Sequence, residues 1–234
     1  MRKTTGRKCV AAACILSLLM TGAARAECTD DAMIVFDGSG SMAEMGFNQI
    51  DEPRIFEARR AVRTAMPQVA PFRRIGLIVY GPGGAGGVGE CSGIELRFGP
   101  RSDAAEAVIA AVDGLEPEGR TALTEAVALA AETLGSPEKP GTVVLVTDGK
   151  ETCGGQTCML AAQLSGTGLV VHVIGFKVRG EHFGWQSEGV TDYQTSVSVA
   201  KCLATQTGGE YVNTETVDEL VEAMSRTLGC KLLF

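Results

Sequence analysis

The chain has 234 residues, of which 45% are hydrophobic and 21% charged, and its formal net charge is −7. This length suits one domain of ordinary size or at most two small ones. The acidic balance argues against nucleic acids and anionic membranes as partners, because both attract basic surfaces, whereas it is compatible with cation binding.

The first 26 residues have the features of a secretory signal peptide. Residues 1–8 carry four positive charges, residues 9–20 are nearly all apolar, and small residues follow at Ala24 and Ala26. This pattern predicts cleavage after Ala26. Retention as a membrane anchor is the alternative, but about a dozen apolar residues fall short of the roughly 20 that span a bilayer. We therefore expect an exported protein, periplasmic or extracellular.

Cleavage leaves one domain, residues 27–234, which has no later segment long and apolar enough to cross a membrane. The five basic residues of the leader are then lost, so that 16 basic residues face 28 acidic ones and the net charge is −12. The acidic character of the chain is thus stronger in the expected mature form.

Within this domain, apolar runs typical of buried strands alternate with segments of helical periodicity. The predicted strands are 32–36, 74–80, 93–98, 142–147, 169–176 and 210–213. The predicted helices are 54–69, 102–113, 121–134, 157–165, 197–207 and 214–228. Pro53 is a start signal for the first helix, and Ser102 is expected to cap the second.

The order of these elements predicts the fold class. Strands that are apolar on both faces and separated by helices indicate a parallel sheet covered on both sides. The glycine-rich link between strands 74–80 and 93–98 is too short for a covered crossover, so the second of them is expected to be an antiparallel edge strand. The prediction is an α/β fold: a Rossmann-like, doubly wound, mostly parallel six-stranded sheet with one antiparallel edge strand and helices on both faces.

Oxygen-bearing side chains follow two of these strands. Asp37, Ser39 and Ser41 leave the first strand in the stretch VFDGSGSM, Asp148 leaves the fourth in VTDG, and Thr121 in GRTAL stands at a loop-to-helix junction. Ligands of open α/β sheets bind beyond the carboxyl ends of the strands. Two carboxylates and three hydroxyls suit Mg²⁺, Mn²⁺ or Ca²⁺. Each stretch alone is also typical of a turn or helix cap, and only their combined order predicts a metal site.

The stretches FDGSGSM, GRTAL and VTDG resemble the metal-ion-dependent adhesion site of von Willebrand factor type A domains, and the likeness runs from Cys28 to Cys230. The resemblance implies direct coordination by Ser39, Ser41 and Thr121, whereas Asp37 and Asp148 act directly or through water. It also implies that an Asp or Glu of a partner protein completes the coordination of the cation. The chain is therefore expected to be an adhesion or protein-binding module and not an enzyme.

Other stretches look most like a secreted bacterial branch of the same family. These are CSGIELRFGP, TDGKETCGG with Cys158, and KCLATQTGGEY. One departure from the family pattern is Ala122, where many members have proline after the threonine. This difference affects the stiffness of the loop more than the coordination of the cation.

Six cysteines follow the leader, an even number that points to disulfides in an exported protein. They are Cys28, Cys91, Cys153, Cys158, Cys202 and Cys230. The first and last are expected to tie the ends of the fold together. The other four allow three pairings: Cys91–Cys153 with Cys158–Cys202 is favoured, and Cys153–Cys158 is a close rival. Zinc is disfavoured because the cysteines lack the spacing of zinc ligands.

The segment 177–196 is long for a link between a strand and a helix. It holds Phe183, Trp185 and Tyr193 and follows the carboxyl end of a strand, near the predicted metal. Aromatic side chains dominate binding hot spots, which favours a recognition loop. A loose insertion without function is the alternative.

Two other functions stay open at this point. A metal-dependent hydrolase would need a base beside the cation, for which Glu44, Glu90 and Glu151 are the candidates by position. His172 is instead expected to be a hydrogen-bonded residue of its strand. An envelope structural or assembly protein, in which the metal only stabilises the fold, is the second alternative.

Overall fold

The computed structural model describes residues 28, 30–45, 52–82, 91–149, 151–178 and 200–230. Its strands form a six-stranded sheet in the order β3-β2-β1-β4-β5-β6. They are β1 (Ala32–Asp37), β2 (Ile75–Tyr80), β3 (Ile94–Arg101), β4 (Gly141–Thr147), β5 (Leu169–Phe176) and β6 (Tyr211–Thr214). Neighbouring strands are parallel except β2 and β3. The predicted mixed sheet with an antiparallel edge strand is confirmed.

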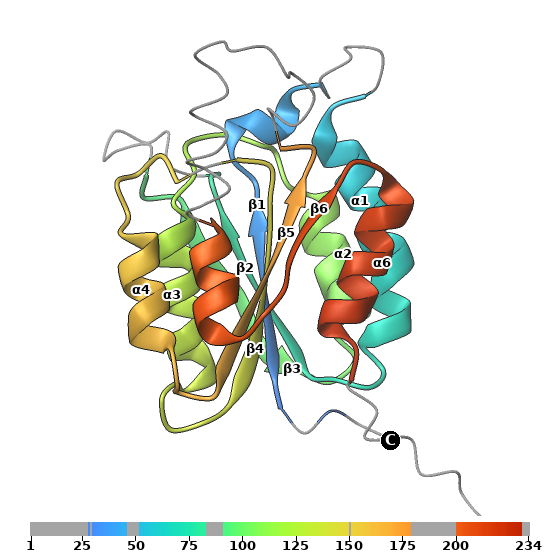
Figure 1. Cartoon of the computed structure of the whole chain (residues 1–234). Coiled ribbons are helices and arrows are strands. Elements are labelled where there is room, and N and C mark those ends of the chain that lie inside the picture. Colours follow the sequence, from blue (N-terminus) through green and yellow to red (C-terminus); the bar gives the residue numbers. More distant parts are fainter. Residues whose placement is uncertain are drawn as a thin grey trace, which may run out of the picture.

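Helices cover both faces of this sheet (Figure 1). One face carries α1 (Arg54–Val69), α2 (Ala105–Asp113) and α6 (Val217–Leu228). The other carries α3 (Leu123–Leu134), α4 (Thr157–Leu164) and a helix whose described part is 200–207. The central strand β1 alternates between the two cores, with Ile34 and Phe36 in the first and Met33 and Val35 in the second.

Two helices begin three residues later than the sequence predicted. Strand β3 continues to Arg101, which pairs with Ile75 of β2, and Asp103 turns the chain in the left-handed region at φ 54°. Ser102 therefore lies in the turn, and Ala104 is the N-cap of α2. Likewise Thr214 ends β6, so α6 starts only after Thr216, whose hydroxyl accepts a hydrogen bond from the backbone N–H of Glu219 in a capping box.

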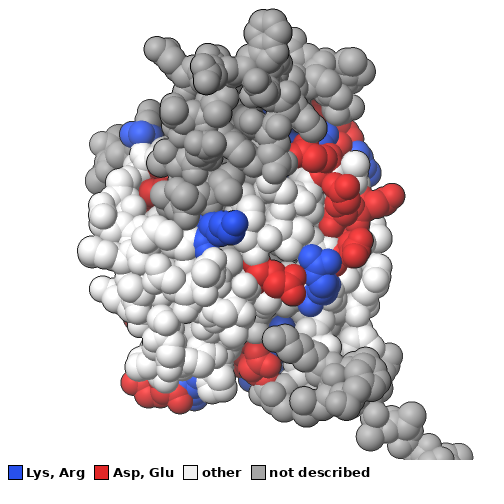
Figure 2. All heavy atoms as spheres, viewed as in Figure 1, with Lys and Arg blue, Asp and Glu red and all other residues white. Residues whose placement is uncertain are grey.

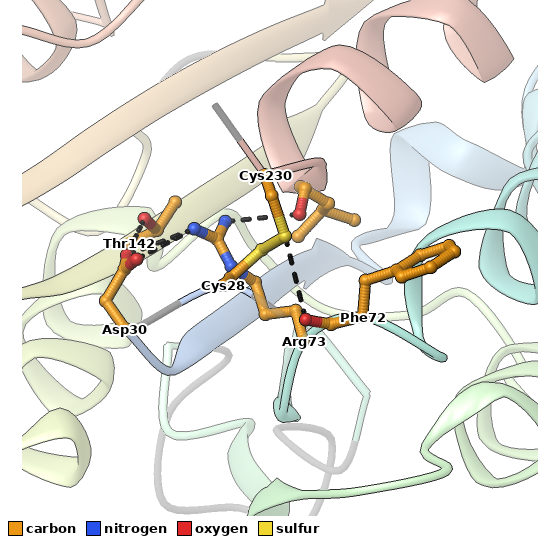
Figure 3. The surroundings of a disulfide bond; sticks show 7 residues. Cys28, Asp30, Phe72, Arg73, Thr142 and Cys230 are labelled. Atoms are coloured by element: carbon orange, nitrogen blue, oxygen red, sulfur yellow. Dashed lines mark hydrogen bonds and ion pairs between the residues drawn. A yellow bond between two sulfur atoms is a disulfide. The ribbon is translucent and has the colours of Figure 1, made fainter. Parts of the chain in front are cut away.

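The parallel strands all end at one edge of the sheet, at the top of Figure 1, where η1 (Gly40–Ala43) follows β1. The described chain ends meet at the opposite pole, where the Cys28–Cys230 disulfide joins them (Figure 3). Beside it the buried Arg73 donates to both carboxylate oxygens of Asp30, at 3.0 and 3.1 Å, and to Leu228 O at 3.2 Å. Thr142 of β4 donates to the same carboxylate at 2.7 Å. This pole is thus held independently of the sheet edge at the top.

The charge of the surface and the hydropathy of the helices are relevant to two classes of partner, nucleic acids and membranes. Figure 2 shows Asp and Glu side chains gathered on the side of the molecule where α6 begins, and Asp218 and Glu219 lie in the first turn of that helix. No helix of the described segments has the length and apolar character that crossing a bilayer requires.

Candidate metal centre

Asp37 is the last residue of β1, and its side chain is completely buried. Both carboxylate oxygens accept hydrogen bonds: Oδ1 from the Ser39 N–H at 2.9 Å and Oδ2 from the Thr147 hydroxyl at 2.7 Å. The Tyr80 hydroxyl donates to Thr147 Oγ1 at 3.0 Å. Burial, and then the negative charge of Asp37, raise the pKa of Tyr80 well above its ordinary value, so this phenol remains a donor at neutral pH. The orientation of Asp37 is therefore fixed from behind.

The loop after Asp37 brings two serines to Asp148, which follows β4. Ser41 Oγ donates to Asp148 Oδ1 at 2.7 Å, and Ser39 Oγ lies 3.0 Å from Ser41 Oγ. The turn of η1 holds this arrangement, because the fully buried Met42 anchors it in the core. The side chains of three of the five predicted ligands are thus linked to one another by hydrogen bonds.

Thr121 approaches from a third segment, two residues before α3. Its loop is fastened to the β1 loop by hydrogen bonds from Glu118 N–H to Gly38 O, 2.9 Å, and from Gly40 N–H to Gly119 O, 3.1 Å. A Cβ atom added to Gly149 would lie 3.9 Å from Thr121 Oγ1 and 4.0 Å from Ser41 Oγ. The space beside Gly149 thus adjoins hydroxyls from two segments, and it stays open because glycine has no side chain to fill it.

Hydrogen bonds with Glu151 and Thr152, in the segment after Asp148, hold Thr121 and the start of α3 in place; these two residues are called the clamp. Thr121 and Thr152 exchange hydrogen bonds, from the Thr121 N–H to Thr152 Oγ1 at 2.9 Å and from the Thr152 N–H to Thr121 O at 3.0 Å. Glu151 Oε2 accepts from the N–H and the hydroxyl of Thr124 at 2.9 and 2.6 Å, and Oε1 accepts from the Cys153 N–H at 2.7 Å. The β4 loop and the start of α3 therefore form one unit.

The six cysteines from Cys28 to Cys230 are all paired in disulfides. Besides Cys28–Cys230, the structure joins Cys91 to Cys153 and Cys158 to Cys202, which is the favoured one of the pairings that the sequence left open. Cys91–Cys153 fastens the clamp segment to the start of β3, and Cys158–Cys202 ties α4 to the next helix. Disulfides of this number are typical of proteins in oxidising compartments.

A buried arginine, which the sequence analysis missed, lies behind Asp148. Arg54 is 1% exposed, its Nη1 donates to Ser41 O at 3.0 Å, and the same nitrogen lies 3.4 Å from Asp148 Oδ2. Burial and the charge of Asp37 raise the pKa of Asp148 to about 7, against the opposing effects of the Ser41 hydrogen bond and of Arg54. The signal available in the sequence was its helical position, because Arg54 lies on the same buried face of α1 as Ala58 and Ala61.

The donor set fits a hard divalent cation. It consists of carboxylate and hydroxyl oxygens, and Asp148 Oδ2 is a buried oxygen that accepts no hydrogen bond from the described residues. Among those same residues no group of three or more His, Cys, Asp or Glu side chains is placed to hold a metal. Any ion at this edge would therefore depend on the three hydroxyls together with the two carboxylates, a set suited to Mg²⁺, Mn²⁺ or Ca²⁺.

The structure brings all five predicted metal ligands to one edge of the sheet. Thr147, the donor behind Asp37, was missed. The expected recognition residues Phe183, Trp185 and Tyr193 lie outside the described residues, as do Glu90 and the predicted signal peptide 1–26. His172 is a sheet residue, as expected, whose Nδ1 accepts a hydrogen bond from the Glu210 N–H at 3.0 Å.

Comparisons with known proteins agree with this architecture. A family model described as von Willebrand factor type A domain matches residues 32–151. The uncharacterized protein YwmD of Bacillus subtilis (strain 168) is 26% identical over 214 residues, 87% of this chain and 87% of that protein.

Two solved structures share the fold. An aerotolerance-related membrane protein from Bacteroides fragilis NCTC 9343 superposes with a TM-score of 0.61 at 19% identity, covering 85% of this chain and 98% of that one. Proximal thread matrix protein 1 from the mussel byssus, solved with a zinc-occupied MIDAS motif, has a TM-score of 0.56 at 18% identity and covers 86% of this chain and 48% of that one.

Proposed function

The chain belongs to the von Willebrand factor type A domain family, and we propose that it is an exported protein-binding module whose binding depends on a divalent cation. The cation is Mg²⁺ in the first place, with Mn²⁺ and Ca²⁺ as the alternatives. Ser39, Ser41 and Thr121 bind it directly, and Asp37 and Asp148 bind it directly or through water. The intact adhesion-site motif and the likeness to a secreted bacterial branch belong to this proposal.

The observation that carries the proposal is the contact between Ser41 and Asp148. These residues come from different loops, yet Oγ and Oδ1 are 2.7 Å apart, and both loops are fastened to the Thr121 segment. Oxygen atoms from three segments at one point are what a small, hard cation needs. The solved mussel protein has zinc in its own MIDAS motif, which supports a divalent cation for the motif in general.

The partner group is the carboxylate of an Asp or Glu on another protein. The cation attracts such a carboxylate as a ligand, and three of the five protein ligands are neutral hydroxyls that add no negative charge to repel it. Export is supported by the three disulfides and by the leader pattern. The segment 177–196 is proposed to add specificity at the same edge.

A catalytic use of the cation is less well supported. Glu151, one of the candidate bases, accepts three hydrogen bonds from Thr124 and Cys153 and so acts as a bracket of the loop. A broad hydrolase screen with and without EDTA tests the alternative, since hydrolysis that EDTA abolishes would favour a metal-dependent hydrolase. A purely structural metal predicts instead that EDTA lowers the melting temperature without releasing a partner.

Crosslinking and pulldown from the native envelope fraction test the proposal. Wild type in Mg²⁺, wild type in EDTA and Asp37→Ala in Mg²⁺ are compared, with Ser102→Ala as a control because this exposed serine lies in the turn before α2. We expect partners that are captured by wild type and the control in Mg²⁺ and lost in the other two samples. Equal capture by Asp37→Ala would contradict a cation-dependent interaction.

A further inference from the structure

Arg54 is the buried positive charge of the candidate metal centre. We propose that it determines the specificity of this centre: its fixed charge weakens binding of the free cation and strengthens binding of a carboxylate to the cation-loaded site. The inference rests on the proposed function, since it concerns the same five ligands, but it assigns a role to a residue outside that set.

The geometry places the guanidinium beside two of the candidate ligands, Asp148 and Ser41. Arg54 is the first residue of α1, and its side chain is 1% exposed. Nη1 lies 3.4 Å from Asp148 Oδ2 and donates to Ser41 O at 3.0 Å. A guanidinium does not lose its proton in proteins, so this charge is permanent at any working pH.

The charge balance gives Arg54 its effect. Asp37 and Asp148 together neutralise a divalent cation, and Arg54 then leaves a net charge of +1 in a buried region that salt screens only weakly. Without Arg54 the loaded site would be neutral. Glu44, whose Oε2 lies 3.9 Å from Arg54 Nη1, offsets part of this excess, but its side chain is 49% exposed and its charge is therefore better screened.

A bracing role for Arg54 predicts something different. If its hydrogen bond to Ser41 O only held the loop in shape, its removal would weaken binding of both the cation and the carboxylate. If its charge matters, the two affinities change in opposite directions, because a neighbouring positive charge repels a cation and attracts an anion. The sign of the change in cation affinity separates the two roles.

The test uses the full chain with its disulfides intact, at pH 8, with Mn²⁺ and acetate as probes. Electron paramagnetic resonance measures free Mn²⁺ and so the cation affinity. Water-proton relaxation measures displacement of Mn²⁺-bound water by acetate. Arg54→Met removes the charge, and Arg54→Lys keeps it. Glu44→Gln removes the negative charge that partly offsets Arg54, and it should not disturb folding because the side chain of Glu44 is half-exposed.

We expect Arg54→Met to bind Mn²⁺ more tightly, on the order of tenfold, and to require several-fold more acetate for half-displacement. Arg54→Lys should remain near wild type in both affinities. Glu44→Gln should change both about twofold in the directions opposite to Arg54→Met, with weaker Mn²⁺ binding and less acetate needed for half-displacement. Weaker Mn²⁺ binding by Arg54→Met, or no change in either affinity, would overturn the inference. Should Arg54→Met not fold, an unchanged or inverted response of Glu44→Gln would overturn it.

Failure of the proposed function has a separate signature. Asp37→Asn is measured in the same assays and is expected to lose Mn²⁺ binding. If wild type itself binds no Mn²⁺, or Asp37→Asn binds it as well as wild type does, the site assignment fails. If wild type binds and Asp37→Asn does not, a lack of response in the Arg54 variants counts against the role of Arg54 alone.

Discussion

Ser41 Oγ donates a 2.7 Å hydrogen bond to Asp148 Oδ1 across 107 positions of sequence. One residue belongs to the loop after β1 and the other to the loop after β4, and these two strands are neighbours at the centre of the sheet. The contact therefore shows that the two loops present their polar groups to each other. Substituting either of these two residues is therefore a direct test of the metal centre.

Ser41→Ala and Asp148→Asn should each weaken Mg²⁺ binding at least tenfold, because each removes a hard oxygen ligand or its charge while preserving the size of the side chain. Isothermal titration calorimetry measures the affinity, and circular dichroism checks the fold. Ser102→Ala is the matched control, since its hydroxyl lies in an exposed turn. Wild-type affinity in either site variant would remove that residue from the centre.

Mg²⁺ affinity should rise with pH up to about 7 and then level off. Burial and the charge of Asp37 raise the pKa of Asp148 to about 7, and a carboxylate must be ionised to bind a cation well. Below that pH the affinity should fall by up to about tenfold per unit. Calorimetry between pH 5.5 and 8.5 checks the profile. Asp148→Asn should give weaker but flatter binding, and an equally steep profile in that variant would assign the titration to another group.

Without a cation, the Asp148 carboxyl should make the stability of the protein fall as pH rises, whereas Mg²⁺ affinity rises with pH. Its pKa is raised in the folded state from the ordinary value of 3.8 to about 7, so the folded state binds more protons than the unfolded state between these values. Stability should therefore fall as pH rises through this window, by at most about 1.4 kcal/mol per unit. Thermal melts in EDTA check this, with Asp148→Asn as reference. A difference between wild type and variant that grows in favour of wild type as pH rises would contradict it.

Much of the fold and of the centre was predictable from the sequence. The runs that became β1, β4 and β5 are apolar on both faces, which indicates a covered parallel sheet, and the ends of parallel strands bring Asp37 and Asp148 to one edge. What stands behind these ligands was not predictable in the same way. Thr147 reaches Asp37 only through the register that pairs Phe36 with Val146, and periodicity carries no register.

Arg54 was missed for a different reason. A charged residue at the start of a helix is ordinarily exposed, and its burial here depends on Asp148 and Ser41, which are remote in sequence. The late start of α2 was also beyond local reasoning. Ser102 is a good cap by residue type, but continued pairing of β3 with β2 up to Arg101 uses the preceding residues and moves the helix start.

Glu151→Gln and Thr152→Val should weaken Mg²⁺ binding several-fold although neither residue is a proposed ligand. Thr152→Val leaves the Thr121 N–H without its 2.9 Å acceptor, and Glu151→Gln weakens three charge-assisted hydrogen bonds to the start of α3 and to Cys153. Each change should cost about 1–3 kcal/mol of stability. Thr142→Val is the control, because it removes a hydrogen bond to Asp30 at the opposite pole. An equal loss of affinity in Thr142→Val would show that stability alone governs binding.

Removing two of the disulfides should separate stability from cation binding. The loops closed by Cys28–Cys230 and Cys91–Cys153 span 202 and 62 residues, so loss of these disulfides should cost about 5 and about 4 kcal/mol of stability, respectively, in the chain-entropy account.

Of these two disulfides, only Cys91–Cys153 lies beside the clamp that holds Thr121. We therefore expect the double variant Cys91→Ser/Cys153→Ser to bind Mg²⁺ several-fold more weakly. Cys28→Ser/Cys230→Ser should lose more stability yet keep its Mg²⁺ affinity, since its cross-link lies at the far pole, at the bottom of Figure 1. Chemical denaturation and calorimetry at a temperature where both variants are folded measure the two quantities, and an affinity loss that follows the stability loss in both would contradict a local role for Cys91–Cys153.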